Sequence, residues 1–319
     1  MMLRPIPGAQ GLLLALILAG PVAANETTPT VAVAGVPAGA TTTAPDAERF
    51  AALPVIDEAI ADGRLEAARD IIVRTAAIHD SPELRLRAAE LALANSALAE
   101  AATSFSDLIS YPKANAALVA AAHQGLGLVR LREGNLAVAQ SEINAAVAAD
   151  PSLVRAWMAR GVVADRQRDF DRADIAYARA IALAPNSALT LTNRGYSLLL
   201  RGRYADAEKD LARAVAIDPG VAAARTNLRL ARAMQGRYRE AFADSTKAGL
   251  AADLNTVGFA AMTRGDYPTA ETYFNRAISL NTRFDKIAWA NLRYLKSITA
   301  PMEHGPRSDD LGAGEAPAH

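Results

Sequence analysis

A fixed step of 34 residues is the strongest constraint on what this chain can fold into. Pro151, Pro185 and Pro219 follow one another at that step, and each stands directly after an apolar, alanine-rich segment. Proline lacks the amide hydrogen that a helix needs, so each of these prolines predicts a break between two helices. A break that recurs every 34 residues indicates a stack of similar helical units, because a single helix pair cannot bury its apolar face alone.

Other residues keep the same step and predict how each unit is built. Alanine recurs at two positions, as Ala139, Ala173, Ala207 and Ala241 and as Ala146, Ala180, Ala214 and Ala248. A large apolar residue recurs at a third, as Leu136, Phe170, Tyr204 and Tyr238. Glycine recurs at two more, as Gly127, Gly161 and Gly195, and as Gly134, Gly202 and Gly236 with Arg168 in its place once. Glycine in a turn adopts a positive φ without steric cost, and glycine at a crossing lets two helices approach closely. The pattern therefore predicts two helices per unit, joined by a tight turn.

This pattern resembles the tetratricopeptide repeat (TPR). The residues of one unit that match the repeat in phase are Trp157, Gly161, Ala173, Tyr177, Ala180 and Pro185. The resemblance implies an all-α fold, a right-handed TPR superhelix (α-solenoid) of about seven helix-turn-helix units with a C-terminal capping helix. A scaffold of this kind holds other proteins and is not an enzyme.

The phase extends in both directions, with changes in the step. Units are expected near 49–81, 82–115 and 251–283, with about four extra residues around Tyr111 to Ala114. On the C-terminal side the step shortens by five residues, so the second helix before residue 251 should be short and end near Gly249. An amphipathic helix from Phe284 to Ile298 should then cap the stack. Its expected inward residues are Ile287, Leu292 and Leu295.

The first 24 residues have the layout of a secretory signal peptide. Arg4 precedes an apolar run from Leu12 to Gly20, and small residues at 22–24 suit cleavage before Asn25. The run is about half of the roughly 20 residues needed to span a bilayer, which leaves an uncleaved anchor as the alternative. We expect an exported, periplasmic protein, with outer-membrane association through partners as a further option.

The segments beside the repeats lack helical periodicity. Residues 25–47 are almost uncharged and mix Val, Ala, Gly, Pro and Thr, which predicts a flexible linker. Residues 301–319 are rich in Pro, Gly and charge, which predicts a disordered tail. The expected division is therefore a signal peptide at 1–24, a linker at 25–47, a TPR array at 48–300 and a tail at 301–319.

Composition points away from catalysis, cofactors and nucleic acids. The chain has no cysteine, which excludes thiolate catalysis, cysteine zinc sites and lipid attachment to cysteine. Its 34 basic and 34 acidic residues balance, whereas polyanion binders carry a basic excess. The four histidines have no partner at metal-ligand spacing, so no metal site or cofactor is expected, and His123 should pack between helices. Gly125 and Gly127 lie within a helical unit and lack the lysine of a phosphate loop.

The resemblance also implies where a partner binds. In this repeat the first helix of each unit lines a groove that suits an extended peptide or a partner helix. The positions that would face it here are Arg155, Met158, Val162, Asp165, Thr192, Asn193, Tyr196, Leu199, Thr226, Asn227, Leu230, Asn255, Phe259 and Met262. Some of these residues could instead serve internal packing alone.

One known groove type does not fit. Repeats that bind chaperone tails clamp a C-terminal carboxylate with Lys and Asn in one unit, Asn in the next, and Lys and Arg in the third. Asn193 matches the middle position, but Met158 and Val162 replace the first pair, and Ala223 and Asn227 replace the last. Recognition of a chaperone tail is therefore not expected.

A narrower resemblance suggests a biological role. Residues 120–298, with Leu191 to Tyr204, Ala224 to Ala231 and Asn255 to Tyr267 as the closest stretches, are similar to the D component of tight-adherence (Tad, or Flp) pilus assembly systems. That family implies a periplasmic factor that helps to assemble a pilus and its outer-membrane secretin. Its members are often lipoproteins, but this chain has no cysteine to acylate. Two other hypotheses stay open: a general periplasmic adaptor for cell-envelope enzymes or outer-membrane protein assembly, and an enzyme or an enzyme's regulatory subunit.

Overall fold

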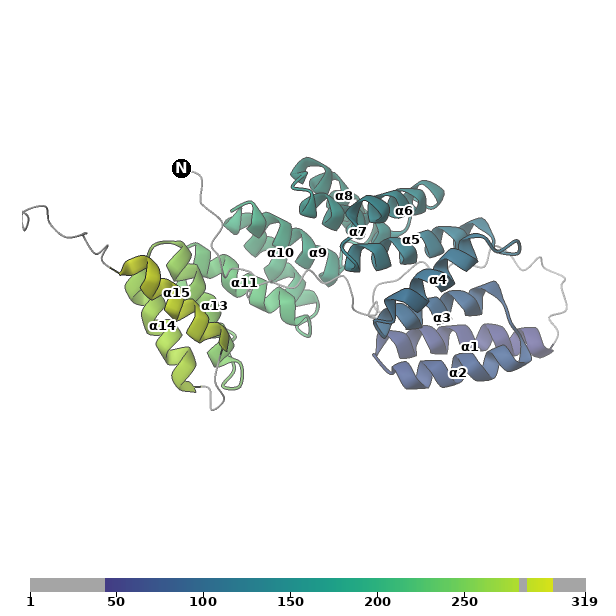
Figure 1. The fold of residues 1–319 in the computed structure, drawn as a ribbon, viewed down its shortest axis with the longest axis horizontal. Coiled ribbons are helices and arrows are strands. Elements are labelled where there is room, and N and C mark those ends of the chain that lie inside the picture. Colours follow the sequence, from purple (N-terminus) through teal and green to yellow (C-terminus); the bar gives the residue numbers. More distant parts are fainter. Residues whose placement is uncertain (1–43, 281–285, 301–319) are drawn as a thin grey trace, which may run out of the picture. The chain divides into compact units, whose positions relative to one another are not determined.

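The computed structural model describes residues 44–280 and 286–300, and all regular structure in them is helical (Figure 1). The helices are α1 (Ala44–Ala61), α2 (Leu65–Ile78), α3 (Pro82–Ala94), α4 (Leu98–Ile109), α5 (Ala116–Arg132), α6 (Leu136–Ala149), α7 (Val154–Arg166), α8 (Phe170–Leu183), α9 (Ala188–Leu200), α10 (Tyr204–Ile217), α11 (Ala222–Met234), α12 (Tyr238–Ala241), α13 (Leu250–Thr263), α14 (Tyr267–Leu280) and α15 (Lys286–Thr299). In chain order, first and second helices alternate through seven pairs before α15, which confirms the predicted fold class. The described residues form two compact units, 44–235 and 236–300.

Helix starts follow local chemistry. Ser81 caps α3 by accepting the amide hydrogen of Leu84, and Pro82 occupies the first turn, where its missing N–H costs nothing. Asn115 caps α5, and Ser187 caps α9 in the same way. These caps fix where each first helix begins, so the register between repeats is set locally.

The recurring glycines mark close crossings between the two helices of a unit. A Cβ atom at Gly161 would lie 2.7 Å from the ring of Tyr177, and one at Gly195 would lie 2.6 Å from Leu211. A Cβ atom at Gly127 would likewise lie 2.6 Å from the side chain of Ile143. The bulky residue of each second helix therefore occupies the place where a side chain of the first helix would be.

The turn inside each unit needs a left-handed residue. Gly134, Gly202 and Gly236 have φ of 81°, 73° and 81°, and Arg168 adopts φ of 60° at the equivalent place. The predicted turn position is therefore confirmed, including its one exception. A non-glycine residue in this region is strained by about 1–2 kcal/mol.

Polar contacts that the sequence did not reveal join consecutive repeats. The C-cap residue that follows each of three first helices donates to a second-helix residue 27 positions earlier: Gln167 to Gln140, Arg201 to Asp174, and Gln235 to Glu208. Donors and acceptors each recur at the 34-residue step. We call these three contacts the junction ladder.

A second repeated contact explains how the extra residues before α5 are absorbed. Arg132 donates to the carbonyl oxygen of Leu93 at 2.6 Å, and Arg166 donates to that of Leu131 at 3.2 Å. The sequence separations are 39 and 35, so they differ by the four inserted residues. The connection around Tyr111 thus bulges while the helix-to-helix contact stays the same.

Two local predictions were wrong. The helix α12 ends at Ala241, not near Gly249, and residues 242–249 form turns. Serine and threonine compete with helical hydrogen bonds, and here the hydroxyl of Thr246 accepts the amide hydrogen of Gly249. In α15, Leu292 and Leu295 are buried as expected, but Ile287 is 48% exposed and Ala288 takes the inward position, because 288, 292 and 295 share one face of a helix.

The ends of the chain carry the expectations that the structure does not test. Helix α1 begins at Ala44, inside the segment expected to be a linker, and Phe284 lies outside the described residues. The expected signal peptide at 1–24, most of the linker and the tail at 301–319 also lie outside them. Among the residues that are described, no helix has both the length and the apolar character required to cross a membrane.

The turn position gives a matched pair of substitutions. We expect Arg168→Gly to raise the free energy of unfolding by about 0.5–1 kcal/mol, because it removes left-handed strain at an exposed side chain. Gly202→Ala should lower it by about 1–2 kcal/mol, since an added Cβ meets nothing closer than 3.8 Å and only the φ of 73° is strained. Guanidinium unfolding followed by circular dichroism measures both, and a destabilised Arg168→Gly variant would contradict this account.

Candidate functional site

All fourteen expected groove residues lie on first helices, namely α7, α9 and α11 in one unit and α13 in the other. Ten are buried: Met158, Val162, Asp165, Thr192, Asn193, Leu199, Asn227, Leu230, Asn255 and Met262. Four are half-buried: Arg155, Tyr196, Thr226 and Phe259. Only these four present accessible atoms, so most of the set packs one first helix against the next. We call the accessible side of α7, α9 and α11 the first-helix face.

Arg155 forms an ion pair that reaches across two repeats. Its Nη1 lies 3.0 Å from the Oε2 of Glu90 on α3. Arg132 lies close enough that burial, and secondarily the charge of Arg155, lower its pKa. Sequence reasoning missed Glu90 and Arg132, although Arg132 and Arg166 share the 34-residue step. The first helices α3, α5 and α7 therefore carry a group of charged side chains next to the first-helix face.

A buried carboxylate lies at the centre of a hydrogen-bonded cluster between α7, α8 and α9. Asp165 is 4% exposed and accepts the hydroxyl hydrogens of Tyr177 at 2.8 Å and Ser197 at 2.6 Å. Burial raises the pKa of Asp165 above its ordinary 3.8, against the effect of the two hydrogen bonds. Burial, together with the nearby Asp165, raises the pKa of Tyr177 well above 10.0. The Asp165 carboxylate thus ties one repeat to the next.

Next to this cluster lies the charged member of the junction ladder. Arg201 holds Asp174 with two parallel hydrogen bonds of 2.7 and 2.8 Å, and its guanidinium lies over the ring of Phe170 at 5.2 Å. The hydrogen bond from Arg201 lowers the pKa of Asp174. The arrangement is a bidentate ion pair capped by an aromatic ring, which fixes the angle between α8 and α9.

Two asparagines stand one repeat apart on α9 and α11, Asn193 and Asn227, and both have no exposed area. Neither the Nδ2 nor the Oδ1 of Asn227 has a hydrogen-bond partner. A buried polar group without a partner costs about 1–3 kcal/mol, and such groups are rare in folded proteins. Asn227 is therefore a buried amide for which the described residues supply no hydrogen-bond partner. Thr226 and Tyr196, both half-buried, are the expected groove residues of the same two helices that are not buried.

In the C-terminal unit the expected groove residues are largely used by the final helix. Asn291 of α15 donates to the Oδ1 of Asn255 at 3.0 Å, and Met262 packs with Leu292 in the same apolar cluster. Phe259 alone remains half-buried. The capping helix therefore takes the place that a partner was expected to occupy next to Asn255.

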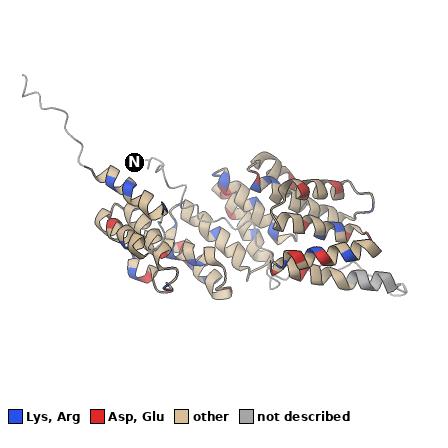
Figure 2. Cartoon of the chain, turned by 60° about the horizontal axis from the view of Figure 1, so that its bottom comes forward, with Lys and Arg blue, Asp and Glu red and all other residues tan. Residues whose placement is uncertain are grey.

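The remaining candidates for chemistry serve packing. His123 is half-buried between α5 and α6, with its Nδ1 2.7 Å from the Oε2 of Glu142, as the packing prediction required. Gly125 meets Phe105 at a helix crossing inside α5 and forms no phosphate loop. Within the described residues no group of three metal-ligand side chains occurs. Basic and acidic residues are interspersed along the helices (Figure 2).

The raised pKa of Asp165 predicts a pH dependence. Between the pKa of the unfolded chain, about 4, and the raised pKa of the folded state, the folded protein binds this proton more tightly than the unfolded protein does. The free energy of unfolding therefore falls as pH rises from about 4 through the folded pKa, and then levels off. The free energy of unfolding of Asp165→Asn, relative to that of the unmodified protein, should increase over this pH range by up to about 1.4 kcal/mol per pH unit. Urea unfolding between pH 3.5 and 7 measures it, with Asp171→Asn on the exposed start of α8 as control. A gain independent of pH would contradict the role assigned to burial.

Comparison with known proteins agrees with this geometry. Residues 125–188 match a family model described as tetratricopeptide repeat. No curated protein matches the chain. Similar solved structures include a tetratricopeptide repeat protein from Parabacteroides merdae, with 14% identity, a TM-score of 0.48, and 78% of this chain and 99% of that one covered. Pseudomonas aeruginosa PilF (56% and 83% covered) and PilW, a type IV pilus biogenesis factor (56% and 90% covered), each have 22% identity and a TM-score of 0.44.

The matched segment 125–188 runs from the middle of α5 to the start of α9, and it contains two of the recurring glycine crossings. The same helix-pair construction continues on both sides of it. Residues 125–188 therefore match the tetratricopeptide repeat, and the described residues on both sides of them have the same all-helical fold of stacked helix pairs.

Proposed function

We propose that this protein is a non-catalytic scaffold that binds an extended segment of a partner protein along the first-helix face of α9 and α11. The observation that carries the proposal is Asn227, a buried amide with neither polar atom paired. A primary amide offers one acceptor and one donor group, which matches the C=O and N–H of a peptide backbone.

The spacing of the two asparagines suits such a segment. Packed helices lie about 8–10 Å apart, and an extended chain advances about 3.3 Å per residue. Asn193 and Asn227 would therefore meet backbone groups about three residues apart. Because Asn227 has no exposed area, binding requires neighbouring side chains to change rotamer. Tyr196 and Thr226 are the accessible residues through which the segment would reach it.

Replacing the amide should separate binding from stability. We expect Asn227→Leu to stabilise the fold by about 1–3 kcal/mol, since it removes an unpaired buried amide, and to abolish partner binding. A photo-crosslinking amino acid at Thr226 would report the partner in cells. Gln124→Leu on α5 is the matched control, because Gln124 is also a buried amide with an unpaired oxygen. A crosslink at Thr226 that survives Asn227→Leu and is lost with Gln124→Leu would place binding elsewhere.

The finer proposal is an assembly factor for a Tad/Flp-type pilus and its secretin in the periplasm. It is supported by the signal-peptide layout of residues 1–24 and by the resemblance of residues 120–298 to the D component of those systems. The alternative is a general periplasmic adaptor for cell-envelope enzymes or outer-membrane protein assembly, which the same first-helix face would serve.

Gene deletion distinguishes the two roles. For a pilus factor, deletion should remove surface pili and secretin multimers, because an assembly step is lost. The unmodified gene should restore both, and the Asn227→Leu variant should not. Pilus counts by electron microscopy and secretin multimers on denaturing gels measure the outcome. Normal pili and secretin in the deletion strain, with envelope enzymes crosslinked at Thr226, would favour the general adaptor.

A further inference from the structure

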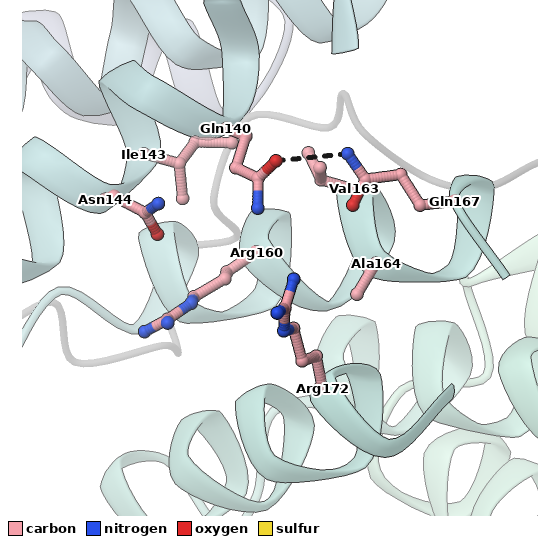
Figure 3. A pocket seen from close by; sticks show the side chains of 8 residues that line it. All are labelled: Gln140, Ile143, Asn144, Arg160, Val163, Ala164, Gln167 and Arg172. Carbon is pink, nitrogen blue, oxygen red and sulfur yellow. Dashed lines mark hydrogen bonds between the residues drawn. The ribbon is translucent and has the colours of Figure 1, made fainter. Parts of the chain in front are cut away.

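A pocket of about 320 Å³ lies between α6, α7 and α8. Its polar lining comes from Gln140 and Asn144 of α6, Arg160 and Gln167 at α7, and Arg172 of α8, with Val163 and Ala164 among its apolar walls. Figure 3 shows the Gln140 amide nitrogen, Asn144 and both guanidinium groups facing the same space. No aspartate or glutamate lines the pocket.

Arg160 is the principal charge in it. Among the described residues no carboxylate forms an ion pair with Arg160, whose guanidinium instead lies over the ring of Trp157 at 5.2 Å. Arg172 is partly neutralised by Asp169, whose Oδ2 lies 3.3 Å from its Nε. The pocket is therefore lined by one arginine without an ion-pair partner among the described residues, Arg160, and by a second, Arg172, that is paired with Asp169 outside the pocket lining.

The amides add hydrogen-bond donors. Gln167 donates to the Oε1 of Gln140 at 3.1 Å, which leaves the Nε2 of Gln140 free to donate into the pocket. Asn144 can present its own amide hydrogens beside it (Figure 3). Guanidinium and amide donors around a small space with apolar walls match a carboxylate carried on a short apolar stem.

We propose that this pocket binds a carboxylate of that kind, either the side chain of a glutamate on a partner protein or a small free carboxylate. The site is separate from the first-helix face. Residues of a helix advance by about 100° each, so Met158 and Arg160 lie about 160° apart around α7. A ligand in the pocket and a segment on the first-helix face can therefore bind at the same time, and this inference does not depend on the proposed function.

Isothermal titration calorimetry with three ligands tests the proposal: glutarate, a capped Gly-Glu-Gly peptide, and inorganic phosphate. We expect glutarate, the peptide or both to bind, and to bind better than phosphate at equal ionic strength. Arg160→Gln should weaken this binding about tenfold, because it removes a charge-assisted contact. Arg179→Gln, at an exposed arginine of α8 outside the pocket, should change it less than about twofold. Binding of the peptide would identify a docking site, and binding of glutarate alone would identify a small-molecule site.

Gln140→Glu is the second variant, and it keeps the acceptor that Gln167 uses. It places a carboxylate in the pocket next to the arginines, so we expect a folded protein that has lost ligand binding. Equal losses in Arg160→Gln and Arg179→Gln, unchanged affinity in Gln140→Glu, tighter binding of phosphate than of either carboxylate, or no binding by any ligand would overturn the proposal. Asn227→Leu should leave all these affinities unchanged, which separates this test from that of the first-helix face.

Discussion

The close crossing of the two helices within a unit is the contact on which the regular part of the array depends. At Gly127, Gly161 and Gly195 the first helix carries no side chain, and a bulky residue of the second helix fills the space. Because that crossing fixes how the two helices of a unit lie, it also places the surfaces that meet the next unit. Every contact between repeats, including the junction ladder and the Asp165 cluster, is built on this geometry.

Most of the fold could be predicted from the sequence, because the residues that recur every 34 positions are those that make the contacts within one unit. Arg168 illustrates this, since its position alone indicated a turn residue with positive φ. The step could not show that α12 ends at Ala241, or that Ala288 instead of Ile287 faces inward, because both positions lie where the 34-residue step is irregular. The expected groove residues all lie on first helices, but their burial depends on the neighbouring repeat, which a pattern within one unit does not describe.

Buried polar groups distinguish this array from a plain alanine-rich stack. Asp165 accepts hydrogen bonds from Tyr177 and Ser197, so it links two repeats at one junction. Asn227 is buried to the same degree but has neither atom paired, which is costly unless something binds there. A buried polar side chain of a first helix is thus hydrogen-bonded in one repeat and left without a partner among the described residues two first helices along the array.

The three contacts of the junction ladder differ in the charge of their donors and acceptors, and this affects how unfolding spreads from one repeat to the next. A repeat array behaves as a one-dimensional series of coupled units, in which each interface has its own energy. The Gln167–Gln140 contact is neutral, whereas Arg201–Asp174 is an ion pair that weakens when salt screens it or when acid protonates Asp174. Glu208 between α10 and α11 likewise accepts from Gln235 and forms an ion pair with Arg232, so the α8–α9 and α10–α11 interfaces are the members of the ladder whose coupling responds to salt and acid. In acid or concentrated salt the array would divide at these two interfaces first, into segments that each keep their own helix pairs.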